Sequence, residues 1–325
     1  MPPSAGTSLK AVKRIPAPKG LPRIAGPDLT RDLDLAQDEL LALLDLTQQV
    51  KTTPARYSKA LAGRYLSLLF EKPSLRTRMT FELAIKQLGG DSVLSVGPIG
   101  DREPLKDVAR NLDRWTNGIV ARTFSQSTID ELAHWSSVPV INALSDRFHP
   151  CQALADVFTL QEKFGEVRGI KVAFVGDGNN VAHSLMLTSL RLGVDFAIGV
   201  PVGYDPDPEI VVQAEALAAV SGARLIITHD PSEAVRGAHA VYTDVWASMG
   251  HEHEREKRLA DFGRYQVNPM LMAQANPDAI FLHCLPAKRG EEVTDDVIES
   301  AQSAVFDQAE NRLHVQKALL LMLIG

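Results

Sequence analysis

Cysteine and long apolar runs are both scarce in this chain of 325 residues. It has only two cysteines, Cys151 and Cys284, which excludes a disulfide-stabilised scaffold and favours a reducing compartment, so we expect a cytoplasmic protein. The longest obvious apolar run, Ala318–Ile324, is far shorter than the ~18 residues that a membrane span needs. We therefore expect no membrane partner.

Positive charge is not in excess either. The net charge is −6 and the isoelectric point about 5.9, which argues against a nucleic-acid partner for the body of the protein. Acidic residues are missing from one segment, residues 1–27, which is rich in proline and carries five basic residues. We expect a disordered basic leader here, with a targeting or subunit-binding arm as the alternative, and globular structure from Asp28 onward.

Apolar runs of strand length alternate with segments of helical spacing along the rest of the chain. This alternation predicts an α/β fold of two doubly wound parallel-sheet domains, with the active site in the cleft between them. The expected strands are Tyr65–Phe70, Ser92–Val96, Gly118–Arg122, Val138–Asn142, Lys171–Gly176, Asp195–Val200, Arg224–Thr228, Ala240–Asp244 and Ala279–His283. The expected helices include one capped by Asp34 with an apolar stripe of Leu40, Leu41 and Leu44, then Thr80–Leu88, Leu105–Trp115, Thr128–Trp135, His149–Phe164, Val181–Leu192, Glu209–Val220 and Glu310–Leu323.

One strand-to-helix turn resembles an anion site. The strand Tyr65–Phe70 leads into a helix whose N-cap position falls on Ser74. The N-terminus of a helix offers backbone N–H groups and a partial positive charge, to which Thr77 adds a hydroxyl. Arg76 and Arg78 lie roughly 200° apart around a helix, so we expect one to face the ligand and the other to brace the structure. An ordinary helix start with solvated basic residues is the plain alternative.

Four motifs in a fixed order resemble one family. Residues 74–78, Ser-Leu-Arg-Thr-Arg, resemble the Ser-Thr-Arg-Thr-Arg phosphate loop of the carbamoyltransferases. Residues 149–156 are similar to that family's His-Pro-x-Gln-x-Leu-Ala-Asp motif. Residues 244–250 resemble the Ser-Met-Gly loop of the ornithine branch, and residues 283–286 match its His-Cys-Leu-Pro. The resemblance to the aspartate/ornithine carbamoyltransferase family extends from about Tyr65 to the C-terminus.

This resemblance implies a transferase that moves the carbamoyl group of carbamoyl phosphate to the δ-amine of L-ornithine. The products would be L-citrulline and phosphate, a step of arginine and amino-acid biosynthesis. It implies a carbamoyl-phosphate-binding domain over residues 28–148, completed by a C-terminal helix at 308–325 that crosses back, and an ornithine-binding domain over residues 149–307. No cofactor and no metal is expected.

The resemblance also implies the residues of the site. Those expected to bind carbamoyl phosphate are Ser74, Leu75, Arg76, Thr77, Arg122, His149, Gln152, Leu285 and Arg312. Those expected to bind ornithine are Asn180, Asp244, Ser248 and Met249, and the expected catalytic residues are Cys284, Arg122 and His149. Plain alternatives are a surface ion pair for Arg122, a helix cap for His149 and a buried, inert thiol for Cys284. The carboxylate of Asp244 suits a cationic amine and argues against aspartate as the acceptor.

Several other readings stay open. The acceptor could be another amine, such as putrescine or an N-acylated ornithine, or the chain could be a non-catalytic paralogue. Gly176 and Gly178 begin a dinucleotide fingerprint and suggest a nicotinamide-binding oxidoreductase, but the third glycine is replaced by Val181. The run from His251 to Glu254 has the residue types of a metal site, although a solvated polar surface explains it equally.

Two positions depart from the family pattern. Leu75 stands where threonine is usual, and Pro98 stands where the family often has glutamine. Pro98 lies in a loop, residues 97–104, that in the family reaches a neighbouring subunit's active site, so a homotrimer is expected.

The chemistry raises a difficulty about the δ-amine. Its pKa should be near 10.4, as in lysine, so at pH 7 only about one molecule in a few thousand is neutral. A carboxylate beside the δ-amine would favour its charged form and raise its pKa further. We therefore expect Asp244 to face the α-ammonium or to be shared with Cys284. The proton lost after attack is expected to leave with the phosphate.

Overall fold

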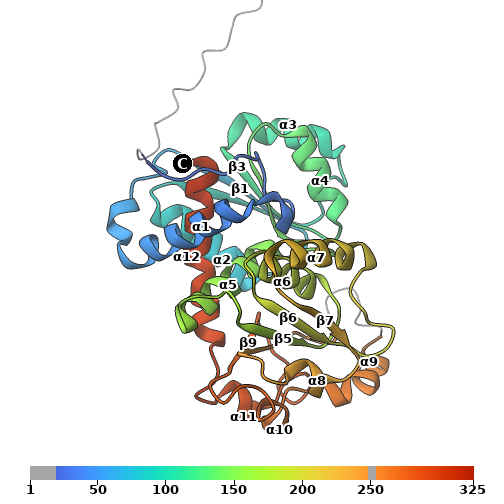
Figure 1. Ribbon diagram of the computed structural model, residues 1–325. Coiled ribbons are helices and arrows are strands. Elements are labelled where there is room, and N and C mark those ends of the chain that lie inside the picture. The colour runs from blue at the N-terminus through green and yellow to red at the C-terminus, as the bar shows by residue number, and fades with distance from the viewer. Residues whose placement is uncertain (1–19, 248–253) are drawn as a thin grey trace, which may run out of the picture.

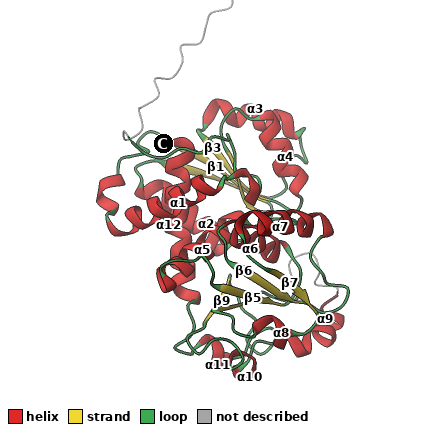
Figure 2. Cartoon of the chain, in the orientation of Figure 1, coloured by secondary structure: helices red, strands yellow, loops and turns green. Residues whose placement is uncertain are grey.

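The computed structural model describes residues 20–247 and 254–325, which form two α/β domains, one above the other in Figure 1. Figure 2 shows a separate sheet in each domain with helices on either side. No helix within these two described ranges is long and apolar enough to cross a membrane.

The first domain is built on a parallel sheet with the strand order β2-β1-β3-β4. Successive residues of β3 face opposite sides, as the pleat requires: Ile119 packs with α3 and α4, and Val120 packs with α1, α2 and α12. The strands are β1 (Tyr65–Phe70), β2 (Asp91–Val96), β3 (Gly118–Arg122) and β4 (Val140–Leu144). The helices are α1 (Gln37–Thr52), α2 (Leu75–Gln87), α3 (Leu105–Trp115) and α4 (Gln126–Trp135).

The second domain has a parallel sheet with the strand order β7-β6-β5-β8-β9. Its residues also alternate: Ala173 faces one apolar cluster and Phe174 the other, so both faces are covered as expected. The strands are β5 (Lys171–Val175), β6 (Asp195–Gly199), β7 (Leu225–Thr228), β8 (Ala240–Thr243) and β9 (Ile280–His283). The helices are α5 (Pro150–Phe164), α6 (Asn180–Arg191), α7 (Pro208–Ser221), α8 (Pro231–Val235), α9 (Arg255–Phe262), α10 (Pro269–Met272) and α11 (Asp295–Ile298).

Strand order places a switch point in each sheet. The chain runs outward from β1 to β2 and then returns to β3, so the connections after β1 and β3 diverge. The connections after β5 and β8 diverge in the same way. Ligands of open α/β sheets bind beyond the carboxyl ends of the strands at such points. The two switch points are followed by the expected phosphate loop and Arg122 in the first domain, and by Asn180 and Asp244 in the second.

The last helix, α12 (Val305–Ile324), joins the two domains. It leaves the second domain and runs up beside α1, α2 and α5, so the expected crossing back to the first domain is confirmed (Figure 1). The carbonyl of Gly325 accepts a hydrogen bond from the guanidinium of Arg23 at 2.6 Å. The division of the chain after residue 148 stays a prediction, because α5 packs against both α12 and α6.

The N-terminal segment differs from expectation in two ways. Residues 20–27 are not free chain, because Ile24 is buried in the main apolar cluster and Arg23 contacts the C-terminus. Helix α1 begins after Ala36, and Asp34 does not cap it. The Asp34 carboxylate instead accepts from the backbone N–H groups of Thr30 and Arg31, closing the preceding 3-10 turn.

A buried carboxylate ties this segment to the second domain. Asp32 accepts hydrogen bonds from Ser184 at 2.6 Å and from Thr188 at 3.2 Å, both on α6. Burial raises the pKa of Asp32 to about 6. The hydroxyl of Ser184 also accepts the backbone N–H of His149 at 2.8 Å. The start of α5 is therefore held by groups from both domains.

Candidate active site

The N-terminus of α2 forms the base of the site. Ser74 is the N-cap as expected, and its hydroxyl accepts the backbone N–H of Thr77 at 3.3 Å. The other N–H groups of the first helical turn have no acceptor within the helix, so they can bind an anion. Arg78 is exposed and pairs with Glu82 at 3.0 Å, whereas Arg76 is half-buried. Arg78 therefore braces the helix, and Arg76 stays the predicted ligand-facing residue of the two.

Three guanidiniums lie close together at this point. Arg76 comes from α2, Arg122 from the end of β3 and Arg312 from α12. Arg312 donates to the Thr77 hydroxyl at 2.5 Å. Burial, then the charge of Arg312 and also that of Arg76, lowers the pKa of Arg122 to about 10. Burial lowers the pKa of Arg76 and of Arg312 as well. Such a cluster is suited to a ligand with more than one negative charge.

Helix α5 presents His149 and Gln152 beside these arginines. Burial, followed by the charges of Arg312 and Arg122, holds the pKa of His149 well below its usual range, so the imidazole is neutral at physiological pH. The side-chain nitrogen of Gln152 donates to Asp156 at 2.8 Å. Both residues are almost fully buried.

Four buried polar atoms of these residues have no hydrogen-bond partner in the part of the chain that the structure describes. They are Nε of Arg122, Nδ1 of His149, Oε1 of Gln152 and Nε of Arg312. Buried polar atoms are normally hydrogen-bonded, and leaving one unpaired costs about 1–3 kcal/mol. The two arginine nitrogens can only donate, whereas the Gln152 carbonyl oxygen can only accept. The set matches a small ligand that carries both oxygen acceptors and an N–H donor.

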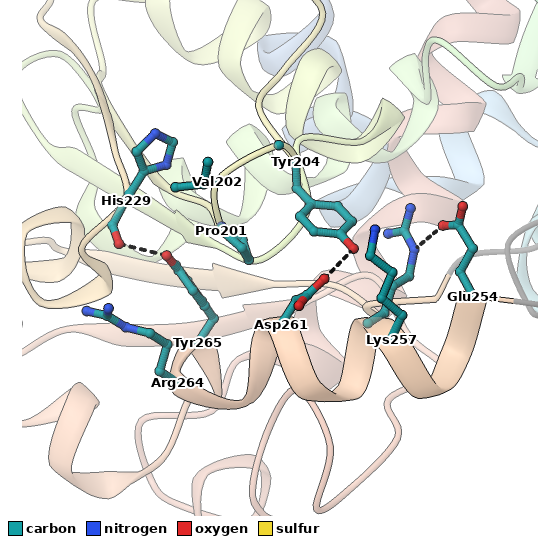
Figure 3. A pocket seen from close by; sticks show the side chains of 11 residues that line it. Pro201, Val202, Tyr204, His229, Glu254, Lys257, Asp261, Arg264 and Tyr265 are labelled. Atoms are coloured by element: carbon teal, nitrogen blue, oxygen red, sulfur yellow. Dashed lines mark hydrogen bonds and ion pairs between the residues drawn. The ribbon is translucent and has the colours of Figure 1, made fainter.

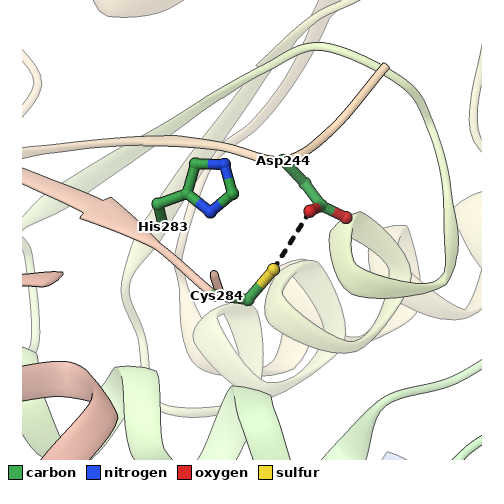
Figure 4. A group of neighbouring side chains, drawn as sticks. All are labelled: Asp244, His283 and Cys284. Carbon is green, nitrogen blue, oxygen red and sulfur yellow. Dashed lines mark hydrogen bonds between the residues drawn. The ribbon is translucent and has the colours of Figure 1, made fainter. Parts of the chain in front are cut away.

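Asp244 and Cys284 face each other across the ends of β8 and β9, with His283 beside them (Figure 4). The thiol of Cys284 donates to Oδ1 of Asp244 at 3.0 Å, and Asn179 donates to Oδ2 at 3.1 Å. Burial and the Asp244 carboxylate raise the pKa of Cys284 well above its usual range. The thiol is therefore neutral and acts as a donor, and it is not poised as a nucleophile.

The imidazole of His283 is already engaged on both sides. Nδ1 accepts the backbone N–H of Leu285 at 2.8 Å, which places the proton on Nε2, 3.2 Å from the buried carboxylate of Glu292. The ligand-type atoms of Asp244, His283 and Cys284 lie within 4.8 Å of one another. A metal ion there would have to displace these hydrogen bonds and the thiol proton. The Leu285–Pro286 peptide bond is cis.

The remaining expected ornithine residues are only partly described. The side-chain nitrogen of Asn180 donates to the carbonyl of Ser145 at 2.6 Å, and its oxygen accepts the N–H of Val181. Ser248 and Met249 lie outside the described residues, as does the stretch from His251 to His253. Sequence reasoning missed Asn179, Ser184 and Gln308, which support site residues. Only Asn179 carried a signal, since it adjoins Asn180 after β5.

A groove of about 680 Å³ lies elsewhere on the second domain (Figure 3). Its side chains largely satisfy one another: Tyr204 donates to Asp261 at 2.8 Å, and Tyr265 donates to the carbonyl of His229 at 2.7 Å. None of the expected site residues lines it. The candidate site is therefore the arginine cluster and the neighbouring Asp244–Cys284 pair.

Fold and site together define a two-domain α/β protein that gathers cationic side chains where its domains meet. Residues 28–162 match the family domain described as "Aspartate/ornithine carbamoyltransferase, carbamoyl-P binding domain". Residues 168–323 match the "Aspartate/ornithine carbamoyltransferase, Asp/Orn binding domain". The chain belongs to the aspartate/ornithine carbamoyltransferase family.

Individual relatives agree with this assignment. The chain is 48% identical to the ornithine carbamoyltransferase of Thermococcus kodakarensis, covering 93% of this chain and 98% of the relative. It is 52% identical to that of Thermus thermophilus, covering 88% of this chain and 93% of the relative. The solved structure of ornithine carbamoyltransferase from Pyrococcus furiosus resembles it with a TM-score of 0.91 at 46% identity, covering 93% and 98% of the two chains.

Two arginines of α2 provide a test of the anion site. Saturating carbamoyl phosphate should raise the melting temperature of the wild type, since ligand at 100 times its Kd stabilises by about 2.7 kcal/mol. Arg76→Met should lose most of this gain, because Arg76 belongs to the arginine cluster. Arg78→Met, on the same helix but paired outward with Glu82, should keep it. Equal gains for the two variants in differential scanning fluorimetry would contradict the assignment.

Proposed function

We propose that this protein transfers the carbamoyl group of carbamoyl phosphate to the δ-amine of L-ornithine, with L-citrulline and phosphate as products. The observation that carries the proposal is the arginine cluster next to a carboxylate. Arg76, Arg122 and Arg312 suit the dianionic phosphate, and Asp244 provides the one negative charge that a diamino acid requires. The family assignment and the relatives' names support the same reaction.

Carbamoyl phosphate needs separate handling of its two ends. In the proposed complex the phosphate binds at the start of α2, to Ser74, Thr77, Arg76 and the N–H of Leu75. Thr77, Arg122 and neutral His149 donate to the carbamoyl oxygen, which makes the carbon electrophilic. The amino group donates to Gln152 and to the carbonyl of Leu285. Arg312 completes the cationic wall through Thr77.

Ornithine is proposed to bind at the ends of β5 and β8. Asp244 takes the α-ammonium, with Ser248 on the amine side, and Asn180 and the Met249 backbone N–H bind the carboxylate. The expected sharing of Asp244 with Cys284 is present in the structure. Because a thiol and an amide already share this carboxylate, its pull on a nearby ammonium is reduced. An N-acylated ornithine has no α-ammonium for Asp244, which disfavours it.

In the proposed reaction the neutral δ-amine attacks the carbamoyl carbon and forms a C–N bond. The carbonyl electrons move to the oxygen, where Arg122 and His149 stabilise the developing negative charge. The intermediate collapses, the bond to the phosphate oxygen breaks, and the amine proton leaves with the phosphate. The nearby guanidiniums disfavour a cation beside them, which assists loss of the proton.

We further propose that the protein works as a cytoplasmic homotrimer in arginine biosynthesis. The two free cysteines suit a reducing cytosol. Helix α2 exposes an apolar side chain every fourth residue, at Leu75, Met79 and Leu83, and the edge strand β2 exposes Val93 and Val96. The three side chains of α2, which we call the α2 patch, lie on one face of the helix, and exposed apolar side chains gathered in this way mark an interface. Strand β2 adjoins residues 97–104, so a neighbouring subunit seated here would lie close to the phosphate loop.

A substrate panel tests the proposed reaction. With carbamoyl phosphate as donor, L-ornithine should yield ureido product. Putrescine, N-acetylornithine and L-aspartate should each give kcat/KM values lower by about 10²-fold or more, since each lacks or reverses a charge that the site reads. Colorimetric detection of the ureido group measures all four. A preference for N-acetylornithine or putrescine would establish the alternative acceptor, and no product with any amine would favour a non-catalytic role.

The pH profile tests the account of the amine. From about pH 7 upward, kcat/KM for ornithine should climb by up to tenfold per pH unit, because the fraction of neutral δ-amine rises towards its pKa. His149 is already neutral and the Cys284 thiol stays protonated, so neither should interrupt this climb. Steady-state rates at saturating carbamoyl phosphate give the profile. A flat profile from about pH 6 to about pH 9, with chemistry rate-limiting, would refute the account.

The mass of the protein in solution tests the assembly. Light scattering should give three times the chain mass of 35.4 kDa. Met79→Glu should reduce this mass by placing a charge in the α2 patch, whereas Val220→Glu, at a still more exposed apolar position on α7, should leave it unchanged. A monomeric wild type would rule out the shared site.

A further inference from the structure

The polar groups beneath the site form a chain whose direction is determined by one backbone N–H. That N–H belongs to His283 and donates to Oε1 of Gln308 at 2.9 Å. Because a backbone N–H can only donate, the Gln308 amide must turn its nitrogen the other way. This nitrogen donates to Oδ1 of Asp156 at 2.6 Å and lies 3.2 Å from the hydroxyl of Tyr242.

Asp156 determines the orientation of the Gln152 amide in the same way. Its Oδ1 accepts the Gln152 side-chain nitrogen at 2.8 Å, and a carboxylate accepts only. The carbonyl oxygen of Gln152 is thereby turned away from Asp156. It is buried and has no hydrogen-bond partner among residues 20–247 and 254–325. Asp156 and Gln308 are completely buried and Gln152 nearly so, so water cannot easily reverse the order.

We infer that Asp156 and Gln308 are positioning residues that hold the Gln152 amide with its carbonyl oxygen towards the acyl group of the donor substrate. This inference rests on the proposed function. An oxygen held in this direction can accept a hydrogen bond but not give one. It pairs with the amino group of carbamoyl phosphate and has no partner in the methyl group of acetyl phosphate. The chain of amides therefore selects a carbamoyl over an acetyl group of similar size.

Asp156 must be ionised to act only as an acceptor in this arrangement. Burial raises its pKa to about 7, and the hydrogen bonds from Gln308 and Gln152 act in the opposite direction, so the carboxylate prevails above that pH. The network joins α5 and α12, which carry Gln152 and Arg312, to β8 and β9, which lead directly into Asp244 and Cys284. The direction of one amide is thus determined by the same strand end that presents the Cys284 thiol.

The test compares binding of carbamoyl phosphate with competitive inhibition by acetyl phosphate, at a pH above the pKa of Asp156. Wild-type protein should prefer carbamoyl phosphate by roughly tenfold to a hundredfold, the value of one matched buried hydrogen bond. Gln308→Leu and Asp156→Leu should bring this ratio towards one, whereas Asp156→Asn should keep it, because its carbonyl oxygen can still accept both amides at the Oδ1 position. KM for ornithine should change little in Asp156→Leu, because the hydrogen bonds of Asp156 go to Gln152 and Gln308.

Gln316→Leu is the matched control. Gln316 lies two turns further along α12, is the same residue type and is equally buried, but its side-chain atoms have no partner in the described chain. This variant should keep the wild-type ratio. If Gln308→Leu fails to fold, Asp156→Leu, which has a similar size and removes the acceptor of both amides, carries the test. An unchanged ratio in a folded variant that still makes citrulline would overturn the inference alone. A wild type that makes no citrulline would instead reject the proposed function.

Discussion

Repulsion among three neighbouring guanidiniums, two of them buried, is the constraint on which the rest of this structure depends. The charges of Arg312 and Arg76 add to burial in lowering the pKa of Arg122. Unit charges a few ångströms apart in a protein interact by several kcal/mol, so the cluster has to be held together by a rigid framework. That framework is a sheet edge, a helix N-terminus and a helix that returns from the other domain. A dianionic ligand would neutralise this repulsion, and the relief of the repulsion would strengthen its binding.

The second domain supplies the opposite charge in a controlled form. Asp244 is shared between a neutral thiol and an amide, so its negative charge is present but partly satisfied. In the proposed function, this arrangement reconciles recognition of a diamino acid with the release of a proton from one of its amines. Beneath Asp244, a hydrogen-bond network through His283, Gln308 and Asp156 connects β9 to α5. The donor in each bond of this network is determined by the backbone N–H of His283. The effective charge of Asp244 and the orientation of the Gln152 amide are thus both determined by groups that do not themselves react.

Much of the framework could be predicted, because it depends on short-range patterns. Apolar runs and their spacing located all nine strands of the described chain, most to within a residue or two. Ser74 was recognisable as an N-cap because capping involves neighbours three residues apart. The predicted cap at Asp34 is wrong, because its carboxylate accepts hydrogen bonds from the backbone N–H groups of Thr30 and Arg31, which precede it in the chain. Residues 20–27 resembled a free leader by composition, yet Ile24 found a place in the apolar cluster.

The sequence by itself determined the alternation of strands and helices, the anion-binding turn and the motifs that imply a family. Those features depend on residues within a few positions of one another. Only the tertiary structure decided which side chains meet: Arg312 and Thr77 are 235 residues apart, and Gln308 and Asp156 are 152 apart. The protonation of Cys284 and His149 was decided there too. Burial and neighbouring charge determine a pKa, and both exist only once distant segments have packed together.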